Sequence, residues 1–250
     1  MAIKGLGLHK QPFKYLDDYC PAIDWESLHN ETCYGLSQVQ WIKRYVSAGV
    51  HKDWSDKEIT TYARNKIFTD KELEYYNQIP AINTEQRIKY TALVTPALHP
   101  FWTVFLRLNR VVDGRRMSNK SVEADCEWSD QTKHFPQLMN LIEQLPFAEI
   151  GRVMFFITEP NNETIPHYDD SLDVTDRPND DFIWFTTSNR YKRIYVLDPE
   201  TNEKHYPDQS KKFIWFNEMD YHGTDSVSRL TFSVRIDGKF QADVKSKMSN

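Results

Sequence analysis

The chain lacks the features of a secreted or membrane-spanning protein. It has three cysteines, an odd number without CxxC spacing, at Cys20, Cys33 and Cys126. Such cysteines are typical of reduced thiols in a cytosolic protein and not of a disulfide framework. The first residues contain no apolar signal-peptide core, and no segment approaches the ~18–20 apolar residues of a membrane span. We therefore expect a cytoplasmic protein with no membrane partner.

Positive charge is also scarce. Lys and Arg number 31 against 36 Asp and Glu, which gives a formal net charge of -5. Nucleic-acid affinity depends on clustered Lys and Arg that displace counterions, so we expect no nucleic-acid partner. Internal repeats and low-complexity tracts are absent as well. The 250 residues, 40% of them hydrophobic, suit a single domain with a sizeable core.

The first half of the chain has mainly helical signals. Residues 1–30 show no regular pattern. Between Ser37 and Ile79 we predict three short helices, and Ser55 and Thr69 each begin a Ser/Thr-x-x-Glu capping box. Residues 101–112 are rich in β-formers and fit either a strand or a helix. Residues 1–134 are therefore expected to form a mostly helical N-terminal part.

The second half begins with one helix and continues as strands. Pro136 opens an amphipathic helix that Pro146 stops. Apolar, β-rich runs with turn signals between them then cover residues 153–158, 182–187, 193–197, 213–216 and 227–236. Residues 198–203 have the composition of a hairpin turn, and the polar tail from Asp243 onward is expected to fray. Residues 135–240 are therefore predicted to form a β-rich core.

Candidate metal ligands follow the first of these runs, where His167 and Asp169 are two positions apart. Imidazole and carboxylate suit an open Fe(II) site in which two His and one carboxylate occupy one face of the metal. The second His is either His205 or His222. We favour His222, because it follows the run 213–216 and precedes the last predicted strand.

Two other groups of residues have a similar pattern. His51 and Asp53, followed by His99, Arg107 and Arg110, repeat the same order, and His29 with Glu31 is a near match. The HxD pattern alone is weakly specific. The capping boxes make the region between Asp53 and His99 helical, so it lacks the strands that would bring such ligands together.

The later set resembles a known family. The helix at Phe135-Pro136, the strand over residues 150–156, His167-Tyr168-Asp169, the distal His222 and the run Arg229-Leu230-Thr231 together look like the Fe(II)- and 2-oxoglutarate-dependent oxygenases. The resemblance covers about residues 135–237. It implies an α+β chain with a mainly β core, a double-stranded β-helix of the jelly-roll or cupin-like type, with the N-terminal helices packed on it.

The resemblance also implies a site. His167, Asp169 and His222 would be the iron ligands and the catalytic centre, and an Arg at the start of the last strand would bind the distal carboxylate of 2-oxoglutarate. Arg binds carboxylate bidentately, and a hydroxyl on the same strand face adds a bond. Arg229 and Thr231 fit these roles. Arg229 follows His222 at a somewhat short spacing, so Arg235 on the same face stays the alternative anchor.

The implied reaction uses Fe(II), 2-oxoglutarate and O₂ to hydroxylate a C–H bond with release of succinate and CO₂. Related halogenases have a small residue where the carboxylate stands, so Asp169 favours hydroxylation. The alternative function is a non-catalytic β-sandwich that binds a ligand or protein and keeps a vestigial metal site.

The substrate is predicted only by class: an amino acid, a peptide-like molecule or another small molecule. Residues 169–181 contain six Asp against one Arg, and this acidic loop would attract a cationic substrate such as a lysine or arginine derivative or a basic peptide. A solvated loop explains the same charges. Arg190 and Arg193 are instead able to meet a substrate carboxylate, and several aromatic residues are candidates for the pocket wall or the core: Trp184, Tyr191, Tyr195 and Trp215.

Overall fold

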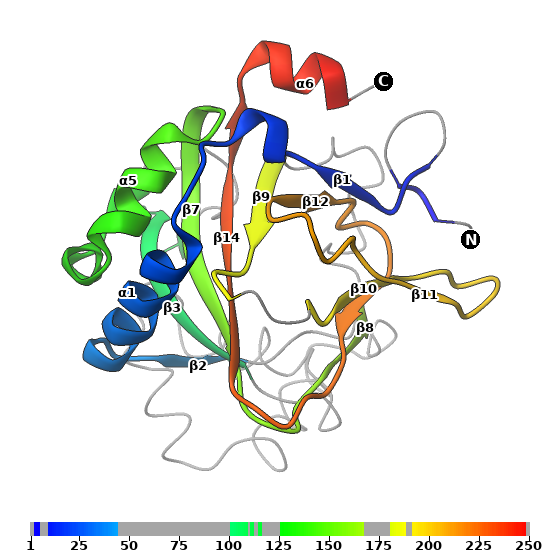
Figure 1. Ribbon diagram of the computed structural model, residues 1–250, viewed down its shortest axis with the longest axis horizontal. Coiled ribbons are helices and arrows are strands. Elements are labelled where there is room, and N and C mark those ends of the chain that lie inside the picture. The colour runs from blue at the N-terminus through cyan, green and yellow to red at the C-terminus, as the bar shows by residue number, and fades with distance from the viewer. Residues whose placement is uncertain are drawn as a thin grey trace.

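The protein is described from a computed structural model that covers residues 3–5, 10–44, 101–109, 111–112, 115–116, 126–167, 181–188 and 192–248. Within these ranges most strands belong to two antiparallel sheets (Figure 1). The large sheet has eight strands in the order β1-β12-β9-β14-β7-β3-β2, with β6 also paired to β3. The small sheet has four strands in the order β11-β10-β13-β8. A separate two-stranded sheet pairs β4 with β5.

The strands of the large sheet are β1 (Phe13–Tyr15), β2 (Ile42–Arg44), β3 (Phe101–Asn109), β6 (Cys126–Trp128), β7 (Phe147–Thr158), β9 (Asp181–Phe185), β12 (Ile214–Phe216) and β14 (Thr231–Phe240). Those of the small sheet are β8 (Thr164–His167), β10 (Ile194–Leu197), β11 (Lys204–His205) and β13 (His222–Thr224). The two-stranded sheet consists of β4 (Val111–Val112) and β5 (Arg115–Arg116). The helices are α1 (Trp25–Gln38), α5 (Pro136–Gln144) and α6 (Ala242–Met248), with 3-10 turns η1 (Asp17–Tyr19) and η3 (Asp130–His134).

From β7 onward the chain moves back and forth between the sheets. β7, β9, β12 and β14 lie in the large sheet, whereas β8, β10, β11 and β13 lie in the small one. This alternation is the topology of a double-stranded β-helix, which confirms the predicted fold class. The small sheet therefore faces the large one across a barrel interior.

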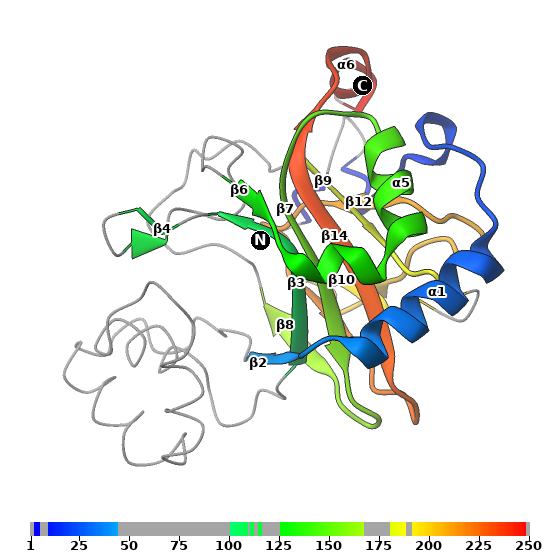
Figure 2. The same cartoon turned by 90° about the vertical axis from the view of Figure 1, so that its left-hand side faces the viewer.

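Two helices cover the outer face of the large sheet, as Figure 2 shows. Phe135 precedes α5, is fully buried and contacts Phe155 of β7, with ring centroids 5.1 Å apart. Phe155 pairs with Val234 of β14, so both face the helices. Because side chains alternate along a strand, Arg235 and its neighbours of the same parity face the small sheet.

Glu31 of α1 caps the N-terminus of α5. Its carboxylate oxygens accept hydrogen bonds from Gln137 N at 2.8 Å and from Leu138 N at 3.0 Å. These N–H groups have no partner within their own helix, and a carboxylate also complements the helix dipole. Glu31, part of the near match noted in the sequence, thus has a structural role in joining α1 to α5.

Gly35 permits the close contact between α1 and the residues before α5. A Cβ atom at this position would lie 2.5 Å from Phe135 Cε1 and 2.6 Å from the His134 carbonyl oxygen. Gly to Ala in a helix is normally stabilising, but here Gly35→Ala should lower the free energy of unfolding by ~1–3 kcal/mol through overpacking. Chemical denaturation checks this against Asn30→Ala, an exposed position on the same helix. A stabilised Gly35→Ala protein would contradict it.

The structure corrects the sequence predictions at four places. The helix α1 begins at Trp25, inside the stretch 1–30 for which no regular element was predicted. Ile42–Arg44 is a strand where a helix opening at Ser37 was predicted. The tail does not fray at Asp243 but forms α6, because Val244 and Met248 are buried. The last strand begins at Thr231, so Arg229 precedes it.

Two further stretches of the described residues agree with their sequence patterns, and the described part of residues 1–134 holds strands β1, β2, β3 and β6 beside α1, where a mostly helical part was predicted. The ambiguous run at 101–112 is a strand over its first nine residues, and the predicted helix at Pro136 is α5. The other helices predicted up to Ile79, with Ser55 and Thr69, lie outside the described residues. So do His51, Asp53 and His99 of the competing ligand set, and Arg110 with them.

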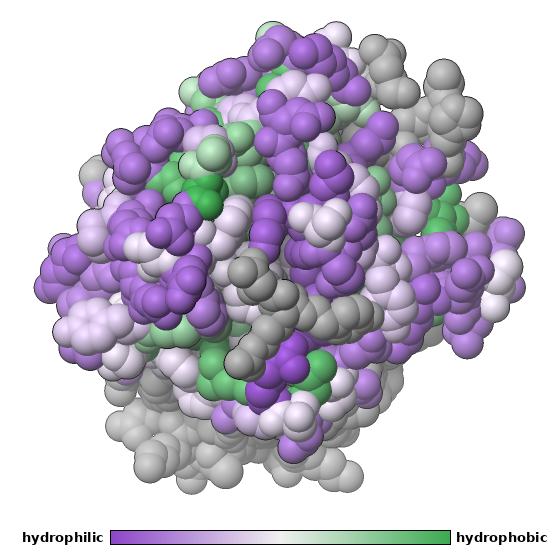
Figure 3. Space-filling model, viewed as in Figure 1, coloured by the Kyte–Doolittle hydropathy of each residue, from purple (hydrophilic) through white to green (hydrophobic). Residues whose placement is uncertain are grey.

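The described part of the chain has no helix long and apolar enough to cross a membrane. In Figure 3 the described surface on the viewed face is largely hydrophilic, with hydrophobic side chains in small separate patches. The large apolar side chains are instead gathered between the sheets and under the helices.

Candidate functional site

His167 and His222 occupy directly opposed positions on adjacent strands of the small sheet. They are Cα partners in the antiparallel pairing of β8 with β13. Opposed residues in such a pair have Cβ atoms ~4.5–5.5 Å apart, a separation that suits two ligands of one metal ion. The structure therefore brings together two positions that lie far apart in the sequence.

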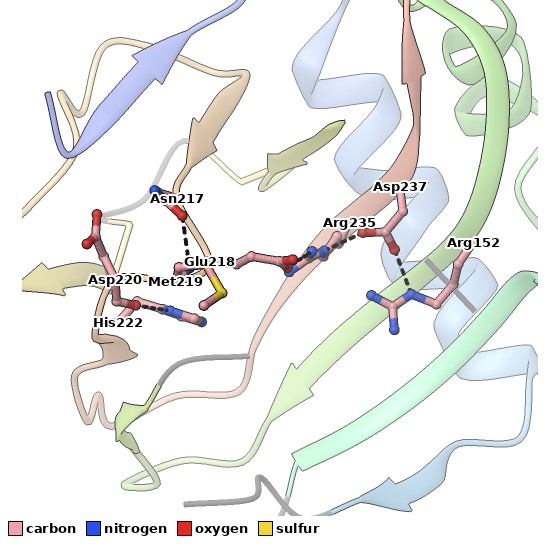
Figure 4. A network of polar contacts seen from close by, with 8 residues as sticks. All are labelled: Arg152, Asn217, Glu218, Met219, Asp220, His222, Arg235 and Asp237. Carbon is pink, nitrogen blue, oxygen red and sulfur yellow. Dashed lines mark hydrogen bonds and ion pairs between the residues drawn. The ribbon is translucent and has the colours of Figure 1, made fainter. Parts of the chain in front are cut away.

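His222 is buried, and its ring orientation is held by a hydrogen bond. The Nδ1 atom lies 2.9 Å from the carbonyl oxygen of Asp220, as Figure 4 shows, and the ring packs on Phe216 with centroids 4.9 Å apart. A carbonyl oxygen only accepts, so Nδ1 is the donor, and in the neutral ring this leaves the lone pair on Nε2. This is the tautomer that histidine ligands adopt when Nε2 binds a metal.

The turn before His222 is fixed by the N-terminal segment. The Asp220 carboxylate accepts hydrogen bonds from Lys4 N at 2.6 Å and Gly5 N at 2.7 Å, and Asn217 Nδ2 donates to Gly5 O at 3.1 Å. Burial raises the pKa of Asp220, while the two backbone N–H groups act in the opposite direction. The N-terminal segment thus supports the strand that carries His222.

His205, the other candidate, lies two strands away from His222. It pairs with Val196 of β10, and the order β11-β10-β13-β8 separates it further from His167. Neighbouring strands are ~4.8 Å apart, so His205 and His167 are ~14 Å apart at strand level. The sheet order therefore favours His222 as the partner of His167.

Asp169 and residues 168–180 of the acidic loop lie outside the described residues, so the ligand role of Asp169 stays a prediction. Among the described residues no group of three His, Cys, Asp or Glu forms a metal cluster. Asp181, counted in the acidic loop, instead belongs to β9. Its carboxylate accepts hydrogen bonds from Phe240 N and Lys245 Nζ, both at 3.0 Å, and so connects β9 to the end of β14 and to α6.

Arg235 lies in a buried chain of charges, shown in Figure 4. Its Nη2 is 2.6 Å from Glu218 Oε2, and its Nε is 2.7 Å from Asp237 Oδ1. The other carboxylate oxygen of Asp237 meets Arg152 Nε at 2.6 Å. Two guanidinium groups are thus matched by two carboxylates. This pairing favours a structural role for Arg235 over the alternative anchor role.

Arg193 immediately precedes β10 and is only 5% exposed. Its Nη1 donates to Thr231 Oγ1 at 3.2 Å, and its Nη2 donates to Thr224 Oγ1 at 2.7 Å and Asn162 O at 2.8 Å. Burial lowers the pKa of Arg193 to about 10, with Asp225 and Glu163 acting in the opposite direction and Arg229 adding to the lowering. Arg193 therefore bridges the small sheet and the start of β14.

The remaining predicted residues divide between the site and the core. Thr231 is half-buried and accepts from Arg193, whereas Arg229 is half-buried just ahead of β14. Trp184, Tyr195 and Trp215 are buried, as expected for core packing. Arg190 and Tyr191 lie outside the described residues. The sequence indicates Arg193 as the first residue of a predicted strand and as a candidate to meet a substrate carboxylate, and its burial is visible only in the fold.

Comparisons with known proteins find no matching family model and no curated protein that matches in sequence. Among solved structures the chain is similar to a Pseudomonas putida prolyl-4-hydroxylase, with 9% identity, 87% of this chain and 100% of that one covered, and a TM-score of 0.33. It is also similar to a 2OG-Fe(II) oxygenase-family oxidoreductase from Burkholderia pseudomallei, with 10% identity, coverage of 74% and 91%, and a TM-score of 0.38.

A third similar structure is a Trichoplax adhaerens prolyl hydroxylase in complex with a hypoxia inducible factor oxygen degradation domain peptide fragment. It shares 9% identity, with 92% of this chain and 98% of that chain covered, and has a TM-score of 0.35. These similarities are distant. The fold assignment accordingly rests on the strand order, and no residue takes its role from these proteins.

Proposed function

We propose that this chain is an Fe(II)- and 2-oxoglutarate-dependent oxygenase that hydroxylates a C–H bond of an amino-acid, peptide-like or other small substrate. The observation that carries the proposal is the His167–His222 pair on adjacent strands of a double-stranded β-helix. His222 is held by Asp220 O in the tautomer that a metal requires, and Asp169 follows His167 at the spacing of a third ligand.

In this proposal His167, Asp169 and His222 hold Fe(II). Iron bound there would, with 2-oxoglutarate and O₂, supply the oxidation of the C–H bond that yields succinate and CO₂. The protein's contribution is to bind, orient and exclude water. The turn at Asp220 orients the His222 ring, and the aromatic Phe216 covers one side of it.

The substrate class rests on the sequence. The acidic residues 169, 170, 173, 176 and 180 would favour a cationic substrate, such as a lysine or arginine derivative or a basic peptide. Asp181 does not belong to this group, because its carboxylate binds the backbone of Phe240 and the side chain of Lys245. The acidic loop is therefore smaller by one charge than the sequence predicts.

The test is spectroscopic and chemical. Under anaerobic conditions, the protein mixed with Fe(II) and 2-oxoglutarate should show a weak visible charge-transfer band. The protein with only one of the two should not show it. Extracts incubated with protein, Fe(II), 2-oxoglutarate and ¹⁸O₂ should then yield succinate and an ¹⁸O-labelled product that identifies the substrate. The absence of both the band and succinate would favour a non-catalytic binding module with a vestigial site.

A further inference from the structure

Arg193 differs from the other buried arginines of the described chain in what surrounds its charge. Arg152 and Arg235 are also buried, and each meets a carboxylate at 2.6 or 2.7 Å. Arg193 instead donates to two threonine hydroxyls and one backbone carbonyl, all uncharged. The described residues place no carboxylate within ion-pair distance of it.

The two nearby carboxylates do not neutralise this charge. Asp225 and Glu163 raise the pKa of Arg193 only through space. The Asp225 carboxylate is bound to Lys204 Nζ at 2.7 Å, and Glu163 is exposed. Within the described chain Arg193 Nε is buried and has no hydrogen-bond partner. A buried guanidinium with an unused N–H group is costly unless an anion completes it.

The place of Arg193 relative to the histidines suits one kind of anion. It binds Thr224, which lies two residues beyond His222 on β13 and therefore ~7 Å along the strand. A five-carbon dicarboxylate in extended form spans ~5 Å between its terminal carbons, from four bonds of ~1.5 Å. A molecule of this length can place one end at the histidines and the other at Arg193.

We propose that Arg193, together with the hydroxyls of Thr224 and Thr231, binds the distal carboxylate of the dicarboxylate cosubstrate. The Nε–H of Arg193 and the hydroxyl protons are the donors to that carboxylate. This inference rests on the proposed oxygenase function for the identity of the ligand. It assigns to Arg193 the anchor role that the sequence pattern predicts for Arg229 or Arg235.

The other candidates have different roles in this arrangement. Arg235 keeps its charge paired with Glu218 and Asp237. Arg229 is close enough to lower the pKa of Arg193, so it adds positive potential near the site, whereas Arg193 donates to the carboxylate. Thr231, predicted as the hydroxyl partner of the anchor, keeps that role and has Arg193 as its neighbour.

The test measures binding. The anaerobic charge-transfer band is titrated with 2-oxoglutarate in the wild type and in Arg193→Gln and Arg229→Gln proteins. We expect Arg193→Gln to raise the Kd for 2-oxoglutarate at least tenfold, because both the positive charge and the guanidinium Nε–H donor are lost. The Kd for Fe(II) alone should be unchanged. Arg229→Gln should raise the Kd for 2-oxoglutarate less than threefold. Arg193→Lys, which keeps the charge, should be intermediate and replaces Arg193→Gln if that variant does not fold.

A second measurement separates this inference from the function on which it rests. Metal-free protein is heated with 2-oxoglutarate, with acetate as the monocarboxylate control. If the wild type shows no band but 2-oxoglutarate raises its Tm through Arg193, the binding site stands and the oxygenase proposal is wrong. If the band appears and Arg193→Gln binds 2-oxoglutarate as the wild type does, the site is wrong and the function stands. A protein with neither a band nor a Tm increase contradicts both.

Discussion

Replacing Asp237 by Ala should lower the free energy of unfolding by ~3–5 kcal/mol, the range expected when one partner of a buried ion pair is removed. Asp237 is fully buried between Arg152 and Arg235, and each of its carboxylate oxygens meets one guanidinium. Asp237→Ala removes the carboxylate that both Arg152 and Arg235 contact. Urea or guanidinium denaturation measures the effect.

An exposed pair between β14 and the neighbouring strand β7 provides the control. Lys239 lies 3.5 Å from Glu149, and both side chains are about half exposed. Lys239→Ala should change stability by less than ~1 kcal/mol, because water screens such pairs. The double variant Asp237→Ala/Arg152→Met should have a higher free energy of unfolding than Asp237→Ala alone. It no longer buries the Arg152 charge without Asp237, and Arg235 still has Glu218. A loss for Asp237→Ala no larger than that for Lys239→Ala would show that the buried chain of charges does not stabilise the fold.

His222→Ala should abolish the Fe(II)–2-oxoglutarate band and weaken Fe(II) binding ~100-fold or more, since altering residues that merely support a metal ligand already costs ~10–100-fold. The physical reason is the loss of the His222 imidazole, whose position on β13 is opposite residue 167 on β8. Anaerobic spectroscopy and Fe(II) titration measure this result. Circular dichroism checks that the sheet remains folded.

The matched control is His205→Ala in the same small sheet. His205 is separated from β13 by β10, so its removal should leave the band and Fe(II) affinity within about twofold of the wild type. His167→Ala should behave as His222→Ala does. A His222→Ala protein that kept the band would remove the proposed iron site, whereas loss of the band in His205→Ala would assign the second imidazole to His205.

Local sequence signals were sufficient for the elements with strong patterns. Pro136 and the apolar stripe after it predicted α5, and the apolar runs predicted β9, β10 and β12 to within two residues and the second half of β7. The weaker cases failed for physical reasons. β2 has only three residues, too few for an alternation of apolar and polar side chains to be recognised. α1 buries Thr32 and Gly35 beside its leucines, so its buried face has little apolar pattern.

The sequence by itself indicated a β-rich second half, and its resemblance to the Fe(II)- and 2-oxoglutarate-dependent oxygenases implied the fold class and the candidate ligands His167, Asp169 and His222. Only the tertiary structure decided which charged groups are satisfied. Arg235 finds Glu218 and Asp237, whereas Arg193 finds only hydroxyls and a carbonyl, and both outcomes depend on strands meeting across a barrel. Burial and pairing arise from contacts between distant segments, so no local pattern could have distinguished the two arginines.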